Sequence, residues 1–238
     1  MRRSAVRFVF AVGMAVISQS SSAAAAYDWS GLYVGANFGY GQANTSWMNQ
    51  ASTALFADYL PGGSFSHEIE GLTGGGQVGY NFQRGRWVYG VEAILDVSAI
   101  AANRLSDTIF GAADDLFNAR IRALALVSGR LGYAWDNVLA YAKAGIALAN
   151  IKASVSDVGG ITTGTGNDSQ WRSGPAFGVG LEYGVTPNLS LGIEYNYIHL
   201  DSASYQLGGG AGSYLWEVEI SDISLVMVRL NYRFNGQR

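Results

Sequence analysis

The residues best suited to hydrolytic chemistry lie together in the run His199-Leu200-Asp201-Ser202. A histidine, an acid and a serine are the side chains that nucleophilic hydrolysis uses. Their spacing matches no nucleophile motif, and the chain contains no G-x-S-x-G sequence. We therefore predict that the protein is not an enzyme, and we keep a lipid-acting hydrolase only as a remote alternative.

Two acidic groups have the residue types of a cation site. His67 stands beside Glu68 and Glu70, and Asp114 is followed by Asp115. Solvated loops explain both groups without a bound metal: the first group as an acidic rim of the first loop, and the second as a solvated loop pair. We therefore expect no metal ion at either place.

Other cofactor chemistry is excluded by what the sequence lacks. The glycine-rich stretch at residues 71–76 is not followed by Lys-Ser/Thr, so it is not a phosphate-binding loop. The chain has no cysteine, which excludes a disulfide framework, a cysteine nucleophile and thiolate metal ligands. We predict no catalytic residue, no metal and no cofactor.

The N-terminal 26 residues have the three parts of a secretory signal peptide. Arg2, Arg3 and Arg7 are followed by an apolar run at residues 8–17 and by Ala24-Ala25-Ala26, where we place the cleavage. The predicted mature domain is residues 27–238. It contains 12 basic and 18 acidic residues, so a nucleic-acid partner is not expected. No later run of about 18 apolar residues predicts a membrane helix.

After the signal peptide, the chain alternates repeatedly between apolar and polar or glycine residues. In residues 32–41, for example, Leu32, Val34 and Phe38 fall on one side of a strand and Asn37 and Gly39 on the other. This period of two predicts β-strands. Eight such runs occur, at about residues 32–41, 72–82, 87–97, 127–133, 138–148, 177–183, 189–197 and 226–234.

The connections between these runs alternate in length. Three are tight turns, at residues 84–86, 134–137 and 184–188, and four are long and polar, at about 42–69, 98–119, 150–172 and 199–221. Residues 50–59 have a weak helical pattern. Short periplasmic turns alternating with long external loops are typical of outer-membrane barrels. The predicted fold class is all-β: an eight-stranded antiparallel up-and-down transmembrane β-barrel.

The strand parity places charged residues inside this barrel. Four acids and four bases form the predicted lumen charge network: Glu92, Asp96, Arg130, Lys143, Glu182, Glu194, Arg229 and Arg233. Eight strands leave a lumen only just wide enough for side chains, so these charges must pair or be hydrated. One interpretation is a plug of salt bridges with trapped water. The other is a narrow, low-conductance path in which charges exchange partners, for which the inward glycines would leave space.

Several segments resemble the alphaproteobacterial surface-antigen family of porin-like outer-membrane proteins. They read WSGLYVGANFGY (29–40), GQVGYNF (76–82), GVE (90–92), GRLGYA (129–134), TPN (186–188) followed by Glu194-Tyr195, and VRLNYRF (228–234). The resemblance implies a barrel similar to the membrane domain of OmpA. It also implies that the assembly machinery reads a signal at Tyr232 and Phe234, although four residues follow Phe234 where the family ends on the aromatic.

The resemblance implies a role in envelope integrity and surface contact rather than catalysis. The expected location is the outer membrane of a Gram-negative bacterium. The expected partners are outer-membrane lipids and lipopolysaccharide, the barrel-assembly machinery during insertion, and a host or surface ligand at the loops. The alternative function is a small porin-like channel with a charged lumen.

Overall fold

The computed structural model describes residues 27–52, 64–105, 115–157, 165–200, 203–209 and 212–234. The predicted signal peptide and the four C-terminal residues lie outside these ranges. Among the described residues, no helix is long and apolar enough to cross a membrane.

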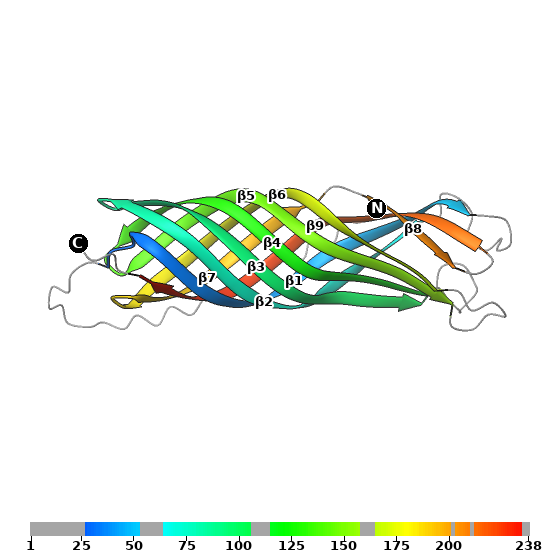
Figure 1. The fold of residues 1–238 in the computed structure, drawn as a ribbon, viewed down its shortest axis with the longest axis horizontal. Helices are drawn as coiled ribbons and strands as arrows, with labels where there is room; N and C mark the ends of the chain where they lie inside the picture. The colour runs from blue at the N-terminus through cyan, green and yellow to red at the C-terminus, as the bar shows by residue number, and fades with distance from the viewer. Residues whose placement is uncertain are drawn as a thin grey trace.

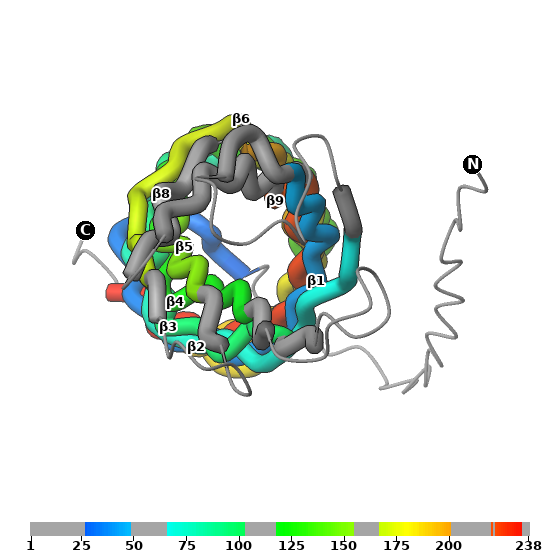
Figure 2. Tube along the Cα trace, turned by 90° about the vertical axis from the view of Figure 1, so that its right-hand side faces the viewer, coloured from blue at the N-terminus to red at the C-terminus, as the bar shows by residue number. Residues whose placement is uncertain are grey.

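The described residues form nine strands that run around a long cylinder (Figure 1). In chain order they are β1 (Gly31–Ser52), β2 (Ser64–Arg84), β3 (Trp87–Leu105), β4 (Asp115–Trp135), β5 (Val138–Asp157), β6 (Thr165–Thr186), β7 (Leu189–His199), β8 (Ala203–Gly209) and β9 (Gly212–Arg233). Every pairing is antiparallel, and β1 pairs with β9 to close the ring seen end-on in Figure 2.

Nine strands make an eight-stranded ring because β7 and β8 both pair with β9, one after the other along its length. β7 pairs with residues 222–232 of β9, and β8 pairs with residues 212–218 of the same strand. The predicted fold class is therefore confirmed. Tight turns follow β2, β4 and β6, as predicted, and each has two residues because the strands extend into the predicted turn segments. Gly85 in the first turn has a φ of 62°, which favours glycine. In outer-membrane barrels the end with short turns faces the periplasm.

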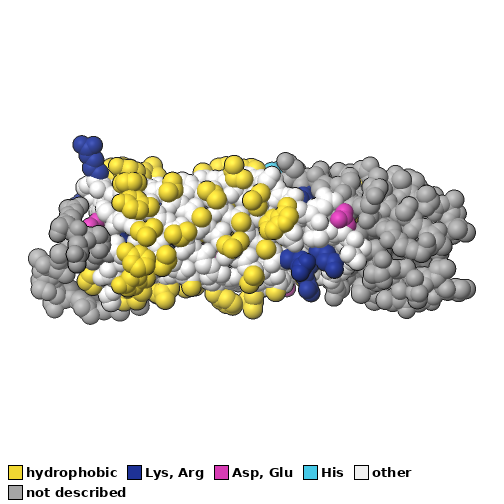
Figure 3. Space-filling view, viewed as in Figure 1, with side chains coloured by type: hydrophobic (Ala, Val, Ile, Leu, Met, Phe, Trp, Pro, Cys, Tyr) yellow, Lys and Arg dark blue, Asp and Glu magenta, His cyan; other side chains and the backbone are white. Residues whose placement is uncertain are grey.

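The outer wall is apolar over the part of the barrel that begins at the short turns, on the left and in the middle of Figure 3. Side chains such as Val91, Val179 and Leu191 are about half exposed there, while the side chains between them point inward. Aromatic residues gather on this wall near the short turns: Tyr80, Phe82, Trp87, Tyr89, Trp135, Tyr183, Tyr232 and Phe234. This is the aromatic girdle of a membrane interface, because amphipathic rings favour the headgroup level.

Toward the opposite end, the alternation inverts. Ile121 on β4 and Ile151 on β5 are buried inside the barrel, whereas Arg120 and Arg122 are exposed on its outer wall. The alternation inverts because the wall beyond the hydrocarbon faces water instead of lipid. Polar side chains then lie on the outside, and apolar side chains pack inside the barrel. Here the barrel has the apolar-in, polar-out pattern of a water-soluble one.

The prediction of four long connections was therefore wrong over most of their length. Strands β1 to β6 each have 19 to 22 residues, and they continue through most of residues 42–69, 98–119 and 150–172. β8 and β9 likewise occupy most of residues 199–221. Residues 50–52, part of the weak helical pattern, belong to β1.

Candidate functional site

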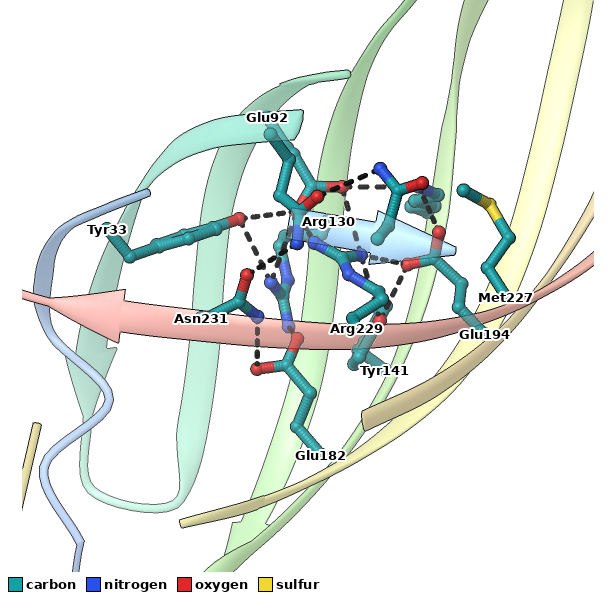
Figure 4. Close-up of polar contacts among 12 residues, drawn as sticks. Tyr33, Glu92, Arg130, Tyr141, Glu182, Glu194, Met227, Arg229 and Asn231 are labelled. Carbon is teal, nitrogen blue, oxygen red and sulfur yellow. Dashed lines mark hydrogen bonds and ion pairs between the residues drawn. The ribbon is translucent and has the colours of Figure 1, made fainter. Parts of the chain in front are cut away.

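A network of buried charges fills the middle of the barrel (Figure 4). Six of the eight predicted lumen residues belong to it, with side chains no more than 3% exposed: Glu92, Arg130, Lys143, Glu182, Glu194 and Arg229. They come from six different strands, each of which places an inward-facing side chain at the same height along the barrel axis. Three acids face three bases, so the formal charges of this group cancel.

Glu92 on β3 is the carboxylate with the most partners. It lies 3.2 Å from Lys143 Nζ and 3.7 Å from an Arg130 nitrogen, and it pairs with Arg229 as well. Lys143 also reaches Glu194, at 2.6 Å, and Arg229 pairs with that same carboxylate. Sharing each charge between two or three partners offsets the large desolvation penalty of burying it.

A second part of the network surrounds Glu182 on β6. Arg130 donates to it at 2.9 Å, and Ser190 and Asn231 donate to its other oxygen at 3.2 Å. Because Arg130 contacts both Glu92 and Glu182, it joins the two parts.

Two tyrosines complete the site, and the sequence analysis did not include them. Tyr33 donates to Glu92 at 2.7 Å and Tyr141 donates to Glu194 at 2.6 Å. The Arg130 guanidinium lies 3.9 Å from the centre of the Tyr141 ring. Both tyrosines fall on the polar side of the strand alternation, which is the signal that would have found them.

The tyrosine rings also cover inward glycines on the neighbouring strand. A Cβ at Gly79 would clash with Tyr33, and one at Gly180 would come within 2.5 Å of the Tyr141 ring. These glycines therefore do not leave open space in the lumen, as the channel interpretation supposed. They make room for aromatic rings, which close packing then holds in place.

The other two predicted members, Asp96 and Arg233, are buried but lie outside the central network, and Arg233 is 3.9 Å from Asp28 instead. Asp96 accepts from Asn37 at 2.9 Å, and the amide side chains of Asn37, Gln77 and Asn231 link it to the network. Arg233 lies near the periplasmic end, where it donates to backbone oxygens of Ser30 and Pro187.

Apolar side chains fill the barrel on both sides of the network. On the outer side is a large cluster, which we call the apolar plug: Ala43, Trp47, Ile69, Ile94, Ile100, Ala119, Ile121, Leu124, Leu126, Ala147, Ala149, Ile151, Ala153, Ala176, Ile198, Leu200, Ile220, Ile223, Leu225 and Met227. On the periplasmic side, the segment before β1 places Tyr27 and Trp29 against Val88, Ala134 and Leu139. The predicted polar plug is thus only the central part of a mostly apolar filling.

The other candidate groups do not converge on a site. Asp201 and Ser202 lie outside the described residues, and His199 contacts Asp222 at 3.1 Å on the exposed wall. His67 stacks near Trp47, with ring centres 6.4 Å apart, while Glu68 is exposed on the other face of β2. Asp115 begins β4, and Asp114 lies outside the described residues.

Comparison with known proteins gives a direct match. A family model for an outer membrane protein beta-barrel domain matches residues 8–234. The chain belongs to this outer-membrane β-barrel family. Its place is the outer membrane of a Gram-negative bacterium, as predicted.

Among the relatives is a 22 kDa outer membrane protein of Rhizobium leguminosarum bv. viciae, 32% identical over 63% of this chain. The match spans 64% of the Rhizobium protein. A 25 kDa outer-membrane immunogenic protein of Brucella canis is 31% identical over 77% of this chain and 71% of its own length. These relatives confirm the predicted resemblance to alphaproteobacterial surface antigens.

A solved structure, the outer membrane protease OmpT from Escherichia coli, is similar in fold with a TM-score of 0.53. The alignment covers 86% of this chain and 97% of that one, at 9% sequence identity. At this identity the likeness concerns the barrel fold alone.

Proposed function

We propose that the protein is a closed barrel that supports the outer membrane and carries its outer rim beyond the bilayer as a surface for contact, without transport or catalysis. The observation that carries this proposal is the filling of the interior. The apolar plug, the charge network and the periplasmic cluster follow one another along the barrel axis. Interiors packed in this way contain few voids larger than a water molecule.

The length of the strands supports the contact role. β1 to β6 continue past the apolar wall, so the barrel wall itself extends beyond the membrane surface. The Brucella relatives are named immunogenic, which is consistent with an exposed outer end. We propose that a host or surface ligand binds at this rim, and that lipopolysaccharide surrounds the wall beneath it.

The competing function is a narrow channel. The observation in its favour is that Glu92 and Arg130 each have more than one partner, so charges could exchange contacts as an ion passes. The apolar plug opposes this path, because an apolar constriction presents a barrier to ions.

A swelling assay on proteoliposomes separates the two functions. Vesicles containing the folded barrel should swell in arabinose no faster than protein-free vesicles. Vesicles containing a porin of known conductance should swell and serve as the positive control. A deletion strain should be more sensitive to detergent, and the wild-type gene should restore resistance. Solute-dependent swelling, or a deletion strain with an unchanged envelope, would refute the proposal.

A further inference from the structure

Three basic side chains lie together on the outer wall of β4 and β5. We call Arg120, Arg122 and Lys152 the outer basic cluster. Arg120 and Arg122 are exposed and Lys152 is partly exposed. In Figure 3 basic side chains are visible at the outer margin of the apolar wall.

The cluster places like charges side by side. Arg120 and Lys152 are direct partners in the β4–β5 register. Directly opposed residues on one face have Cβ atoms roughly 4.5–5.5 Å apart, and like charges at that separation destabilise the sheet. None of the ion pairs found among the described residues includes any of the three cations.

A β-bulge brings the third cation to the same wall. The register shifts between Ile121 and Ala123, so Ile121 and Leu124 both point inward while Arg122 between them is exposed. Bulges commonly re-aim a side chain in this way. The bulge therefore adds a cation to the wall without breaking the apolar plug inside.

The nearest acids on the described part of the wall make no ion pair with the cluster. In the row that contains Arg120, the register places Ala101 of β3 next to it and Glu70 of β2 beyond. On β6, Asp168 accepts from the Ser169 amide at 2.7 Å and from Gln170 at 2.8 Å. Among the described residues, no acid lies within ion-pair distance of the outer basic cluster, so the cluster faces the exterior as a group of three cations.

Neighbouring residues fix the height of the cluster relative to the membrane. Trp171 of β6 is 60% exposed on the outer wall, and its register partner is Asn150, two residues before Lys152. Leu148, two residues further toward the periplasm, is exposed and belongs to the apolar wall. Because tryptophan favours the interface between hydrocarbon and water, the cluster lies at the level of the outer-leaflet headgroups.

We propose that the outer basic cluster binds the anionic headgroup of an outer-leaflet glycolipid through its phosphate groups. Arginine offers two parallel N–H donors to a phosphate, and Lys152 adds a third point of charge. A phosphate between Arg120 and Lys152 would turn a repulsive pair into a bridged one. The proposal makes the lipid partner of the proposed function specific, and it rests on that function only for the orientation of the barrel.

Native mass spectrometry of the folded barrel in detergent tests this site, with bisphosphorylated lipid A as the probe. The variant R120Q/K152Q should bind the probe at least about tenfold more weakly, because each cation near an anionic headgroup contributes to affinity. The matched control R84Q/R86Q removes two exposed cations at the periplasmic end and should bind like the wild type. Heat-modifiable migration on gels checks that every variant is folded.

The arms of the experiment separate the sources of the anion. Monophosphorylated lipid A should bind more weakly than the bisphosphorylated form, and millimolar inorganic phosphate should not compete with either. Equal binding by wild type and R120Q/K152Q, an equal loss in both double variants, or full competition by inorganic phosphate would each overturn the site. None of these results depends on whether the barrel conducts, so the closed-barrel proposal stands or falls separately.

Discussion

Arg229 of β9 reaches across the lumen to Glu92 of β3, with its Nη1 3.2 Å from Glu92 Oε1. The two strands are separated by β1 and β2 in the ring, so the contact ties together distant parts of the wall. Both side chains are fully buried. An ion pair in this position stabilises the closed ring as long as both charged side chains are present, because one buried charge without its partner is destabilising.

Arg229→Ala should destabilise the barrel strongly, because it leaves the carboxylates of Glu92 and Glu194 buried with fewer cations. Removing one partner of a buried ion pair costs about 3–5 kcal/mol. Urea unfolding of the protein in phosphatidylcholine vesicles, followed by tryptophan fluorescence, measures this change. Arg84→Ala, at an exposed periplasmic position, should change the free energy of unfolding by no more than about 0.5 kcal/mol. Equal stability of the two variants would show that the network does not hold the ring.

Gly180→Ser should destabilise the folded barrel, although the sequence alone suggested that the inward glycines leave empty space in the lumen. The new Cβ meets the Tyr141 ring at 2.5 Å and must displace it from Arg130 and Glu194. Overpacking of this kind costs about 1–3 kcal/mol. Gly129→Ser is the control, because its Cβ would face the exterior with its nearest neighbour, the Gly90 carbonyl oxygen, 4.0 Å away. Folding yields in vesicles that fall equally for both would contradict the packing of Tyr141 over Gly180.

Val179→Arg should impair folding into vesicles, since Val179 is 57% exposed on the lipid-facing wall. Arginine on that face costs about 2–4 kcal/mol near the bilayer midplane and about 0–1 kcal/mol near the interface. The same substitution at Val185, which is exposed beside the periplasmic turn of the same strand, should be tolerated. If Val185→Arg blocks insertion while Val179→Arg folds, the membrane does not lie where the apolar wall indicates.

Ile121→Ala tests the apolar plug. Ile121 is fully buried inside the barrel, so its truncation should leave a cavity and cost about 2–5 kcal/mol. Ile146, which is 62% exposed on the apolar wall, provides the same substitution in a place where lipid chains fill the gap. The Ile146→Ala variant should unfold at nearly the wild-type urea concentration. A larger loss at Ile146 than at Ile121 would mean that the outer half of the interior is not packed.

Strand parity could be predicted from the sequence wherever the wall crosses the membrane. Lipid outside and polar groups inside impose a strict alternation, so Val179 and Glu182 could be assigned to opposite faces. The same rule located the six charged residues of the network. It could not tell that Asp96 would bond to Asn37 or that Arg233 would cap the turn region, because those partners depend on height along the barrel.

The strands of the outer part of the barrel could not be predicted from one phase of alternation, for a definite physical reason. Beyond the hydrocarbon, the apolar residues change from the outward to the inward face, as Trp47 and Ile69 show. If only runs with apolar residues on the outward face are sought, each predicted strand ends where the apolar residues change to the inward face. Beyond that point the outward residues are polar, and their composition resembles that of a loop. Testing both phases on each run would have predicted the long strands and the apolar plug.

Planar-bilayer recording of the purified, folded protein tests the closed barrel most directly. The account predicts no unitary currents from the wild type in 1 M KCl, and none from Arg130→Ala or Glu92→Ala, because the apolar plug remains above the network in both variants. Reproducible unitary currents from the wild type that change in either variant would contradict it, since ions would then pass through the charge network.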